Sequence, residues 1–526
     1  MKRCYFFSEV IIGLFLVFSM IGCSPAPKKT EDATKNYYSE QYRPQFHFSP
    51  EAHWMNDPNG MVYYEGEYHL FYQYFPDSTV WGPMHWGHAV STDLVHWEHL
   101  PIALYPDSLG LIFSGSAVID WGNTTGFGSK ANPPMIAIFT YNNMEGEKSG
   151  RNDFQSQGIA YSLDKGRTWT KYSGNPVLPN PGIRDFRDPK VSWNKEINKW
   201  IMVFAAHDRV KFYSSSNLKE WIFESDFGMG SGAHTGVWEC PDLFSIKVEG
   251  SEDTKWVLLV SINPGGPNGG SATQYFVGSF NGKSFIPETS ETNWVDWGRD
   301  NYAGVTWSDI PESDGRRLFL GWMSNWDYAT VVPTDVWRSA MTFPREINIK
   351  KVDGKFLLVS NPAKELESIR DANLSSTILS ETISGEKEID MKGVNLSQCE
   401  ITIDLTFEKE LPESFGLILE NNLNESVKIG YSKADSKFFI DRTTSGKNGF
   451  SDKFSGIAWA PYTFKNQVQL QLLLDASSVE LFVDGGNLVM TDLLFPTEPF
   501  KKIKLFTSGG ELQLQKAEIV GLKRIW

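Results

Sequence analysis

The segment His53-Trp54-Met55-Asn56-Asp57-Pro58-Asn59-Gly60 combines a turn signal with an acidic side chain. Proline fixes φ, and asparagine and glycine tolerate positive φ, so Asn56 to Gly60 predicts a tight turn. Residues 61–74, which follow, are rich in aromatic side chains and have the composition of a strand. Asp57 is therefore expected on a rigid bend at the start of a strand. A lone Asp-Pro is most often a solvated turn, but Trp54 and Met55 place apolar bulk beside this acid.

Polar motifs of the same kind recur along residues 44–348, separated by 57, 74, 51 and 61 residues when counted from Asp57, Ser114, Asp188, Glu239 and Asp300. The motifs are Asn56-Asp57, Phe113-Ser114-Gly115-Ser116, Arg187-Asp188-Pro189, Glu239-Cys240-Pro241 and Arg299-Asp300-Asn301. Any one of these acids taken alone is more often structural. Their regular spacing favours one shared site.

A second series of motifs lies between the first, and each member predicts a hairpin turn followed by an aromatic side chain. The members are Ser91 to Trp97, Ser162 to Trp169, Ser215 to Trp221 and Ser279 to Phe285. The aromatic positions are separated by 72, 52 and 64 residues, the length that four strands with loops require, which is typical of propeller blades. Roughly 300 residues at about 60 per blade predict five blades, with the first series converging on the axis.

Composition and charge limit the class of ligand. The chain has 526 residues, is rich in Gly, Trp and Phe, and carries a net charge of −15, and it has almost no helical periodicity. These features predict an all-β protein of two domains and argue against a nucleic acid or an anionic membrane surface as partner. With 14% aromatic residues, a neutral ligand with apolar faces, such as a sugar, fits better.

Convergence on the axis would place Asp57, Asp188, Glu239 and Asp300 around one pocket. Clustered carboxylates repel, so the pKa of at least one must rise unless a cation compensates. Two carboxyl groups with separated pKa values are what glycoside hydrolysis uses. Calcium is the competing use of such a cluster, but no loop shows the alternating Asp/Asn ligands of a calcium site, so no metal and no cofactor are expected. Nearby aromatic side chains could stack on sugar faces: Trp54, Trp81, Phe113, Trp238 and Trp326.

The motifs in this order resemble glycoside hydrolase family 32, the family of invertases, inulinases, levanases and fructan hydrolases. The resemblance runs from about residue 44 to the C-terminus and implies a five-bladed β-propeller followed by a β-sandwich, with a retaining mechanism that needs no metal. It implies Asp57 as the nucleophile, Glu239 as the general acid and base, and Asp188 as the stabiliser of the transition state. Arg187 is expected beside Asp188, where its charge would keep that carboxylate ionised while Glu239 stays protonated.

The resemblance also implies which side chains contact the terminal fructose. They are Trp54, Asn56, Gln73, Trp81, Phe113, Ser114 and Arg187, with Trp326 and Tyr328 as candidates for the rim.

The character of the chain changes after Ile349. Alternating runs at Cys399–Phe407, Val468–Leu474 and Val479–Val483, the turn at Asp484-Gly485-Gly486 and a last strand near Lys502–Thr507 predict a β-sandwich. The expected organisation is a propeller over residues 44–348, a linker over 349–370 and a sandwich over 371–526. The sandwich is expected to pack against the propeller, with an accessory sugar site as an alternative.

The N-terminus predicts export. Lys2 and Arg3 precede a mostly apolar run, Val10 to Ile21, that is too short to span a membrane but suits a signal peptide. Gly22-Cys23 resembles a bacterial lipoprotein cleavage site, which predicts a signal peptide over residues 1–22, a lipidated Cys23 and a tether over 23–43. The chain would then be anchored to a bacterial membrane by lipid alone, although an ordinary signal peptide with an incidental cysteine is the alternative.

The sequence leaves three rival functions to consider, and also the choice between exo and endo action on the polymer. Ser162 to Trp169 fits a box found in sialidases, but the arginines and tyrosine that a sialidase needs are not in phase. A non-catalytic fructan-binding lipoprotein is the second rival, and a fructosyltransferase is the third. Residues 265–278 look more like exo-acting than endo-acting fructanases, so release of free fructose from levan or inulin, with sucrose as a poorer substrate, is expected. An endo-acting levanase or inulinase is the alternative; linkage preference and oligomeric state are unassigned.

Overall fold

The computed structural model describes residues 37–407, 410–464 and 466–526, so the predicted signal peptide, Cys23 and most of the predicted tether lie outside the described residues. Strand β1 (His53–Tyr64) contains the Asp57 segment and pairs antiparallel with β2 (Glu67–Phe75). The turn predicted at Asn56 to Gly60 is wrong: the register shifts on both sides of Pro58, so the segment is an irregular part of one strand. Gly60 has φ +55°, and an added Cβ would lie 2.7 Å from the Phe71 ring. Glycine is thus required where β1 passes its neighbours.

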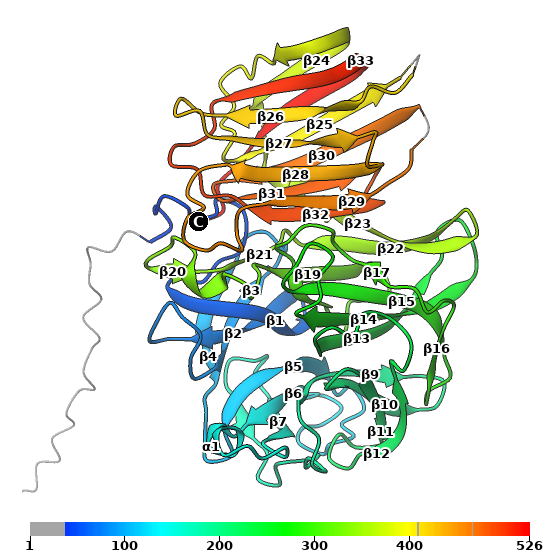
Figure 1. Cartoon of the computed structure of the whole chain (residues 1–526). Coiled ribbons are helices and arrows are strands. Elements are labelled where there is room, and N and C mark those ends of the chain that lie inside the picture. The colour runs from blue at the N-terminus through cyan, green and yellow to red at the C-terminus, as the bar shows by residue number, and fades with distance from the viewer. Residues whose placement is uncertain (1–36, 408–409, 465) are drawn as a thin grey trace, which may run out of the picture. The chain divides into compact units, whose positions relative to one another are not determined.

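Five sheets, antiparallel except where β20 joins the first, form the N-terminal part of the described chain (Figure 1). The first contains β1, β2, β3 (His85–Ser91), β4 (Glu98–Leu104) and β20 (Trp337–Arg338), and the second β5 (Leu111–Ile119), β6 (Met135–Asn142), β7 (Gln155–Ser162) and β8 (Thr170–Lys171). The third contains β9 (Phe186–Asn194), β10 (Lys199–Ala206), β11 (Val210–Ser215) and β12 (Ile222–Phe227), and the fourth β13 (Val237–Lys247), β14 (Thr254–Asn263), β15 (Ala272–Phe280), β16 (Phe285–Pro287) and β17 (Asn293–Trp294). The fifth contains β18 (Tyr302–Thr306), β19 (Arg317–Met323), β21 (Ala340–Met341), β22 (Arg345–Val352) and β23 (Lys355–Pro362). The predicted five-bladed propeller is confirmed.

The four predicted hairpins are the turns between the third and fourth strands of the first four blades. Asp93 Oδ1 accepts the N–H groups of Val95 and His96, and Asn217 Oδ1 repeats this pattern in the third blade. The segment from Ser162 to Trp169, which suggested a sialidase, is the same structural turn in the second blade. These motifs therefore report blade architecture and not substrate.

The first strand of each blade faces the axis. Neighbouring pairs among β1, β5, β9, β13 and β18 contact one another around a closed ring. Blades one and five are joined because β20 pairs in parallel with the start of β1. The expected linker begins too early: residues 349–362 belong to β22 and β23, whose alternating apolar residues pack Ile349 and Leu358 into the core of the fifth blade. The connection after the propeller is the short 3₁₀ helix η2 (Lys364–Ile369).

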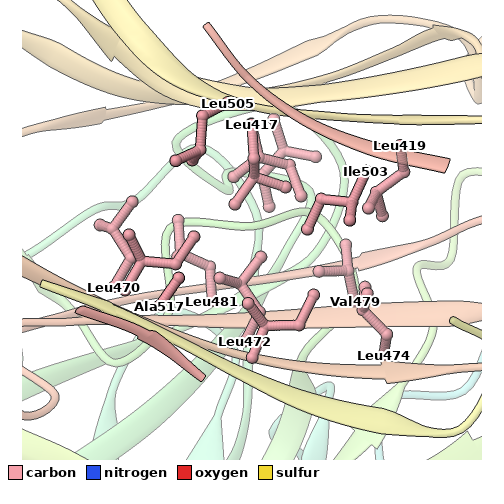
Figure 2. Packing of buried hydrophobic residues seen from close by; sticks show 14 of the residues in the cluster. Leu417, Leu419, Leu470, Leu472, Leu474, Val479, Leu481, Ile503, Leu505 and Ala517 are labelled. Atoms are coloured by element: carbon pink, nitrogen blue, oxygen red, sulfur yellow. The ribbon is translucent and has the colours of Figure 1, made fainter. Parts of the chain in front are cut away.

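The C-terminal part is the predicted β-sandwich. Its strands are β24 (Arg370–Glu388), β25 (Cys399–Thr406), β26 (Ser414–Glu420), β27 (Ser426–Ser432), β28 (Lys437–Thr444), β29 (Ile457–Pro461), β30 (Gln467–Asp475), β31 (Ser478–Val483), β32 (Leu488–Leu493) and β33 (Lys502–Leu522). The long β33 belongs to both layers, since its first part pairs with β26 and its second part with β25. Leu417 and Leu505 from one layer face Leu470 and Leu472 from the other in the core (Figure 2).

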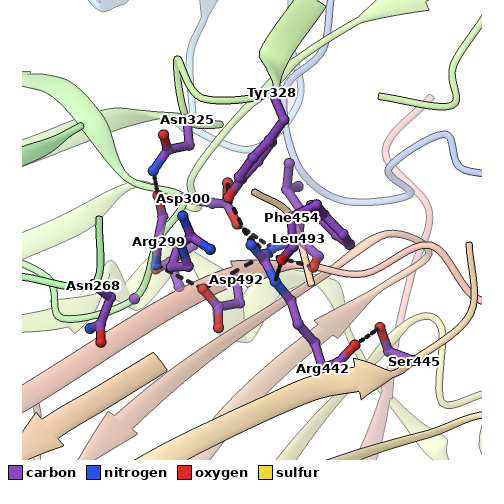
Figure 3. A network of polar contacts seen from close by, with 12 residues as sticks. Asn268, Arg299, Asp300, Asn325, Tyr328, Arg442, Ser445, Phe454, Asp492 and Leu493 are labelled. Carbon is purple, nitrogen blue, oxygen red and sulfur yellow. Dashed lines mark hydrogen bonds and ion pairs between the residues drawn. The ribbon is translucent and has the colours of Figure 1, made fainter. Parts of the chain in front are cut away.

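Tyr38–Trp526 form one compact unit, and buried ion pairs connect its propeller and sandwich strands. Arg442 on β28 donates to Asp300 across 2.7 Å and to the hydroxyl of Tyr328 across 2.8 Å (Figure 3). Arg345 on β22 lies between Asp296 and Glu480. Such charges are tolerated inside a protein because they are paired and hydrogen-bonded. No helix within the described ranges has the length and apolarity to cross a bilayer.

Candidate active site

The three acids singled out by the sequence share one pocket. Asp57 lies on β1, Asp188 on β9 and Glu239 on β13, each near the start of an innermost strand. The pocket has a volume of about 190 Å³. It is lined by Asn56, Asp57, Gln73, Trp81, Phe113, Ser114, Glu147, Gln155, Asp185, Arg187, Asp188, Glu239 and Trp326. All the expected contact residues except Trp54 and Tyr328 are in this set.

Hydrogen bonds hold both carboxylate oxygens of Asp57. Asn56 Nδ2 donates to Oδ1 across 2.9 Å, and Ser114 Oγ donates to Oδ2 across 2.7 Å. Burial raises the pKa of Asp57, and the charge of Glu239 raises it further, while the two hydrogen bonds oppose these effects. The carboxylate is thus fixed in orientation and lies close to a second acid.

Trp54 holds Asn56, a hydrogen-bond donor to Asp57, in position. Its side chain is fully buried, and Nε1 donates to Asn56 Oδ1 across 2.7 Å, which directs the amide nitrogen of Asn56 to Asp57. The expectation that Trp54 and Trp238 stack on sugar is wrong, because both rings are buried and neither lines the pocket. Trp54 instead stacks against the partly exposed Trp326, which does line it.

Arg187 pairs with a different acid from the one expected. Its Nη2 lies 2.8 Å from Glu239 Oε1 and its Nη1 2.6 Å from Asp185 Oδ1, whereas Nε is 3.8 Å from Asp188. The other oxygen of Glu239 accepts a hydrogen bond from the hydroxyl of Tyr302. Burial raises the pKa of Asp188 to about 7, against the lowering effect of Arg187. Arg187 therefore pairs with Glu239 and Asp185, and its lowering effect on the pKa of Asp188 does not offset burial.

Cys240 connects two of the acids. Its backbone N–H donates to Asp188 Oδ2 across 3.1 Å, and its Sγ lies 3.5 Å from Asp57 Oδ2. Burial raises the pKa of this thiol well above its usual value, so it remains a neutral donor. Asp188 and Cys240 both have positive φ, at 65° and 44°, and strained backbone of this kind concentrates at functional sites. Cys240 belongs to one of the repeated motifs, but its spacing from the acids in sequence gave no indication of this role.

At the start of the fifth blade, Tyr302 and not Asp300 contacts an acid of the pocket, Glu239. Asp300 is fully buried, accepts from Tyr328 across 2.7 Å, and pairs with Arg442 of the sandwich. Asp300 and Tyr328 therefore belong to the contact between the two domains and not to the pocket. The regular spacing did point to this blade, but the side chain beside Glu239 is two residues further along.

Three other pocket residues were missed by sequence reasoning. Glu147 lies on the short helix α1 (Met144–Lys148), and Asn142 joins Glu147 to Gln155 through two hydrogen bonds. Asp185 precedes β9. None lies in a repeated motif, so no signal in the sequence marked them. Gln73 Nε2 and Gln155 Oε1 are buried and have no hydrogen-bond partner among the described residues. A donor and an acceptor are thus available at the pocket wall.

No group of three or more His, Cys, Asp and Glu side chains with the arrangement of a metal site occurs among the described residues. What the pocket offers chemically is five carboxyl groups, one guanidinium, and hydroxyl and amide groups, with aromatic side chains at the wall. Trp81 and Phe113 pack edge to face with their ring centres 6.1 Å apart.

Comparison with known proteins gives matches over most of the chain. Residues 47–362 match the model "Glycosyl hydrolases family 32 N-terminal domain", and residues 365–521 match "Glycosyl hydrolases family 32 C terminal". The chain is 49% identical to the levanase of Bacillus subtilis over 523 residues, covering 98% of this chain and 75% of the levanase. It is 39% identical to the extracellular exo-inulinase of Aspergillus awamori, covering 93% and 96%. The structure of β-fructofuranosidase from Schwanniomyces occidentalis complexed with fructosyl-erythritol superposes with a TM-score of 0.84 at 34% identity, covering 93% and 99%.

Proposed function

The chain belongs to glycosyl hydrolase family 32, and from this premise we propose that it is a retaining β-fructosidase that releases terminal fructose from levan, inulin or both. Sucrose is expected as a poorer substrate. The observation that carries the proposal is the meeting of Asp57, Asp188 and Glu239 in one small pocket with unpartnered amide groups at its wall. Relatives named as a levanase and an exo-inulinase support fructans as the substrate class.

Asp57 is assigned as the nucleophile. The hydrogen bonds from Asn56 and Ser114 fix its two oxygens, so attack on the anomeric carbon requires little reorganisation. Attack breaks the bond to the leaving oxygen and forms a covalent fructosyl-enzyme, which water then hydrolyses. Because each step inverts the anomeric carbon, the product keeps the configuration of the substrate.

Glu239 is assigned as the acid that protonates the leaving oxygen and then as the base that activates water. Its two partners differ in what they allow. The guanidinium of Arg187 only donates, but the hydroxyl of Tyr302 donates to a carboxylate and accepts from a protonated carboxyl. Tyr302 is therefore a suitable partner for both protonation states of Glu239 during one turnover.

Asp188 is assigned to the hydroxyl groups of the fructose and to the positive charge that develops on the sugar ring. Its raised pKa, and that of Asp57, arise from burial and from the mutual repulsion of three acids. The pocket therefore holds protons on these two carboxyl groups more tightly than water does.

The shape of the pocket supports exo action. At about 190 Å³ it is smaller than the roughly 300–1,000 Å³ of ordinary ligand pockets. Trp81, Phe113 and Trp326 stand at its wall. A terminal fructose can enter such a space from one side, whereas an internal unit has neighbours at both ends.

Early products of digestion test this function. Levan and inulin are digested side by side and sampled within the first few per cent of conversion, with the Asp57→Ala protein as the control. Fructose as the sole early product is the expected result. A ladder of oligosaccharides would show an endo-acting enzyme, and lengthening of oligosaccharides at high sucrose would show a fructosyltransferase. The relative rates on the two polymers measure linkage preference.

We further propose that the protein is exported and anchored to a membrane by lipid on Cys23, which lies outside the described residues. The basic start, the apolar run and the Gly22-Cys23 pair support this. The relative from A. awamori is named as an extracellular enzyme, which supports export.

A further inference from the structure

A second cavity lies at the other end of the innermost strands. Its volume is about 770 Å³, and none of its lining residues lines the active-site pocket. On β1, Asp57 lines the pocket and Tyr63 the cavity, and on β9 the corresponding residues are Asp188 and Trp193. Five or six strand residues span roughly 17–20 Å. The two spaces are therefore separate.

Two exposed tryptophans stand at this cavity. Trp121 follows β5 and is 56% exposed, and Trp193 on β9 is 36% exposed. Single exposed apolar residues are ordinary on protein surfaces. Two indole rings at one concave site are less so, because a large apolar surface of this kind normally marks a binding site.

Both rings are fixed in position. Trp121 Nε1 donates to Asp309 Oδ1 across 2.9 Å, and the ring packs edge to face on Tyr64. Trp193 packs edge to face on Trp200 with ring centres 5.1 Å apart, and Trp200 is itself held by a hydrogen bond to Thr124. The protein would therefore lose little side-chain conformational entropy when a ligand stacks on these rings.

The cavity lining holds the acids Glu65, Asp242, Asp309 and Glu312 and the bases Lys190, Lys195 and Arg317. Lys190 lies 3.3 Å from Asp242, and Lys195 pairs with Glu312. Asp242 Oδ1 is buried and has no hydrogen-bond partner among the described residues, so an acceptor is present as well. Glu65 pairs with Lys165 just outside the lining, so acids and bases balance and the net field is small, which favours a neutral polar ligand over an anion or a cation. Fixed aromatic faces combined with hydrogen-bonding groups fit a carbohydrate.

We propose that this cavity is a second, non-catalytic carbohydrate site that binds a fructosyl segment of the polymer substrate by stacking on Trp121 and Trp193. The identity of the ligand as a fructan rests on the proposed function. Binding here would hold the enzyme on a polymer while terminal units enter the pocket at the opposite end of the propeller. Short substrates, which cannot reach both sites, would gain nothing from it.

The first test is oxidative footprinting of the full-length Asp57→Ala protein, which does not consume the ligand. Oxidation of Trp121 and Trp193 is measured by mass spectrometry with inulin or levan oligosaccharides, with maltohexaose, and without sugar. Protection of both residues by a fructan alone is the expected result. No protection, or equal protection by the glucan, would overturn the proposal. Hydrolysis of fructan by the wild-type protein is measured separately, so loss of the proposed function is distinguished from loss of this site.

The second test compares Trp121→Ala/Trp193→Ala with Phe223→Ala. Phe223 is 49% exposed on β12 and lines neither space, so it controls for loss of surface aromatic area. In affinity electrophoresis through levan or inulin, the double variant should lose at least about tenfold in apparent affinity, as is common when tryptophan contacts are truncated. Its kcat/KM on sucrose should match that of the wild type. Unchanged retardation of the double variant, or equal loss in the Phe223 variant, would contradict the site.

Discussion

The thiol of Cys240 lies 3.5 Å from Oδ2 of Asp57, the oxygen that also accepts the hydrogen bond from Ser114. The pKa of the thiol is raised by burial and by three neighbouring acids, so it acts as a neutral donor to the assigned nucleophile. The backbone N–H of the same residue holds Asp188. One residue thus positions two of the three acids, through its side chain and its main chain.

Cys240→Ala is expected to lower kcat/KM several-fold and to raise the apparent pKa of the acidic limb of the pH–rate profile. The reason is that Asp57 loses a donor that favours its ionised form, while the main-chain contact to Asp188 remains. Cys240→Ser, which keeps a donor, should lie closer to the wild type. A wild-type profile in the alanine variant would show that the thiol only fills space.

Asp57→Ala and Glu239→Ala are each expected to lower kcat by roughly 10⁴-fold or more while leaving the fold intact, because water cannot replace the nucleophile or the acid. Glu239→Ala should retain more activity on a fructoside with an activated leaving group, which needs no protonation. Asp57→Ala should gain no such advantage. Near-normal turnover by Asp57→Ala would mean that the assigned mechanism is wrong.

Asp300→Asn is expected to leave kcat on a fructan close to that of the wild type, whereas Asp188→Asn should abolish most activity. Asp300 is buried against Arg442 and does not line the pocket. The Asp300 variant should instead be less stable, and Arg442→Met should cost about 3–5 kcal/mol because it leaves Asp300 buried without a cation. Denaturant unfolding measures the stability. If Asp300→Asn lost as much activity as Asp188→Asn, Asp300 would have a role in the active site after all.

Stability should depend on pH through His47, whose ring nitrogens lie 2.7 Å from Asp475 and 2.7 Å from Glu480 of the sandwich. Hydrogen bonds and charge from these two acids raise the pKa of His47 from 6.5 to about 9, against the opposing effect of burial. The pKa of Glu480 is lowered from 4.5 to about 2, against burial, by Arg345 and His47.

The folded-state pKa of His47 is above its unfolded value, so its contribution is complete below pH 6.5 and is lost as pH rises through 9. The contribution of Glu480 is complete above pH 4.5 and is lost as pH falls through 2. Stability should therefore be greatest between about pH 4.5 and 6.5. The loss on the alkaline side should be of the order of 3 kcal/mol. His47→Gln should remove the alkaline slope between pH 6.5 and 9, and an unchanged slope would assign it to other groups.

Cys23→Ser is expected to release the protein from the membrane fraction. In the proposed anchor, the lipids on Cys23 are the only attachment to the membrane. Without them no anchoring signal remains, and stable anchoring needs more than one. Fractionation after a high-salt wash measures the effect, with a substitution at Ser24 as the control. A Cys23→Ser protein that still sediments with membranes would place the anchor elsewhere.

Local pattern determined the architecture and the acids. The hairpin motifs recur because the first four blades use the same turn after their third strand, and hydrogen bonds from the following N–H groups to Asp93 and Asn217 explain the residues chosen. Equal phase in a propeller pointed to Asp57, Asp188, Glu239 and Asp300 together, and the resemblance to glycoside hydrolase family 32 singled out the first three. The alternating runs of the sandwich likewise required only a period of two.

Tertiary structure decided which neighbour of each motif faces the pocket. Successive side chains of a strand alternate between faces only where the backbone is regular. Asp300 precedes β18, so Tyr302 and not Asp300 meets Glu239. The register of β1 shifts between Met55 and Pro58, and Trp54 lies behind Asn56. The sequence also could not identify the ion-pair partner of Arg187, because Glu239 lies on β13 of another blade. The second cavity joins side chains that no single motif contains, and only closure of the five blades brings them together.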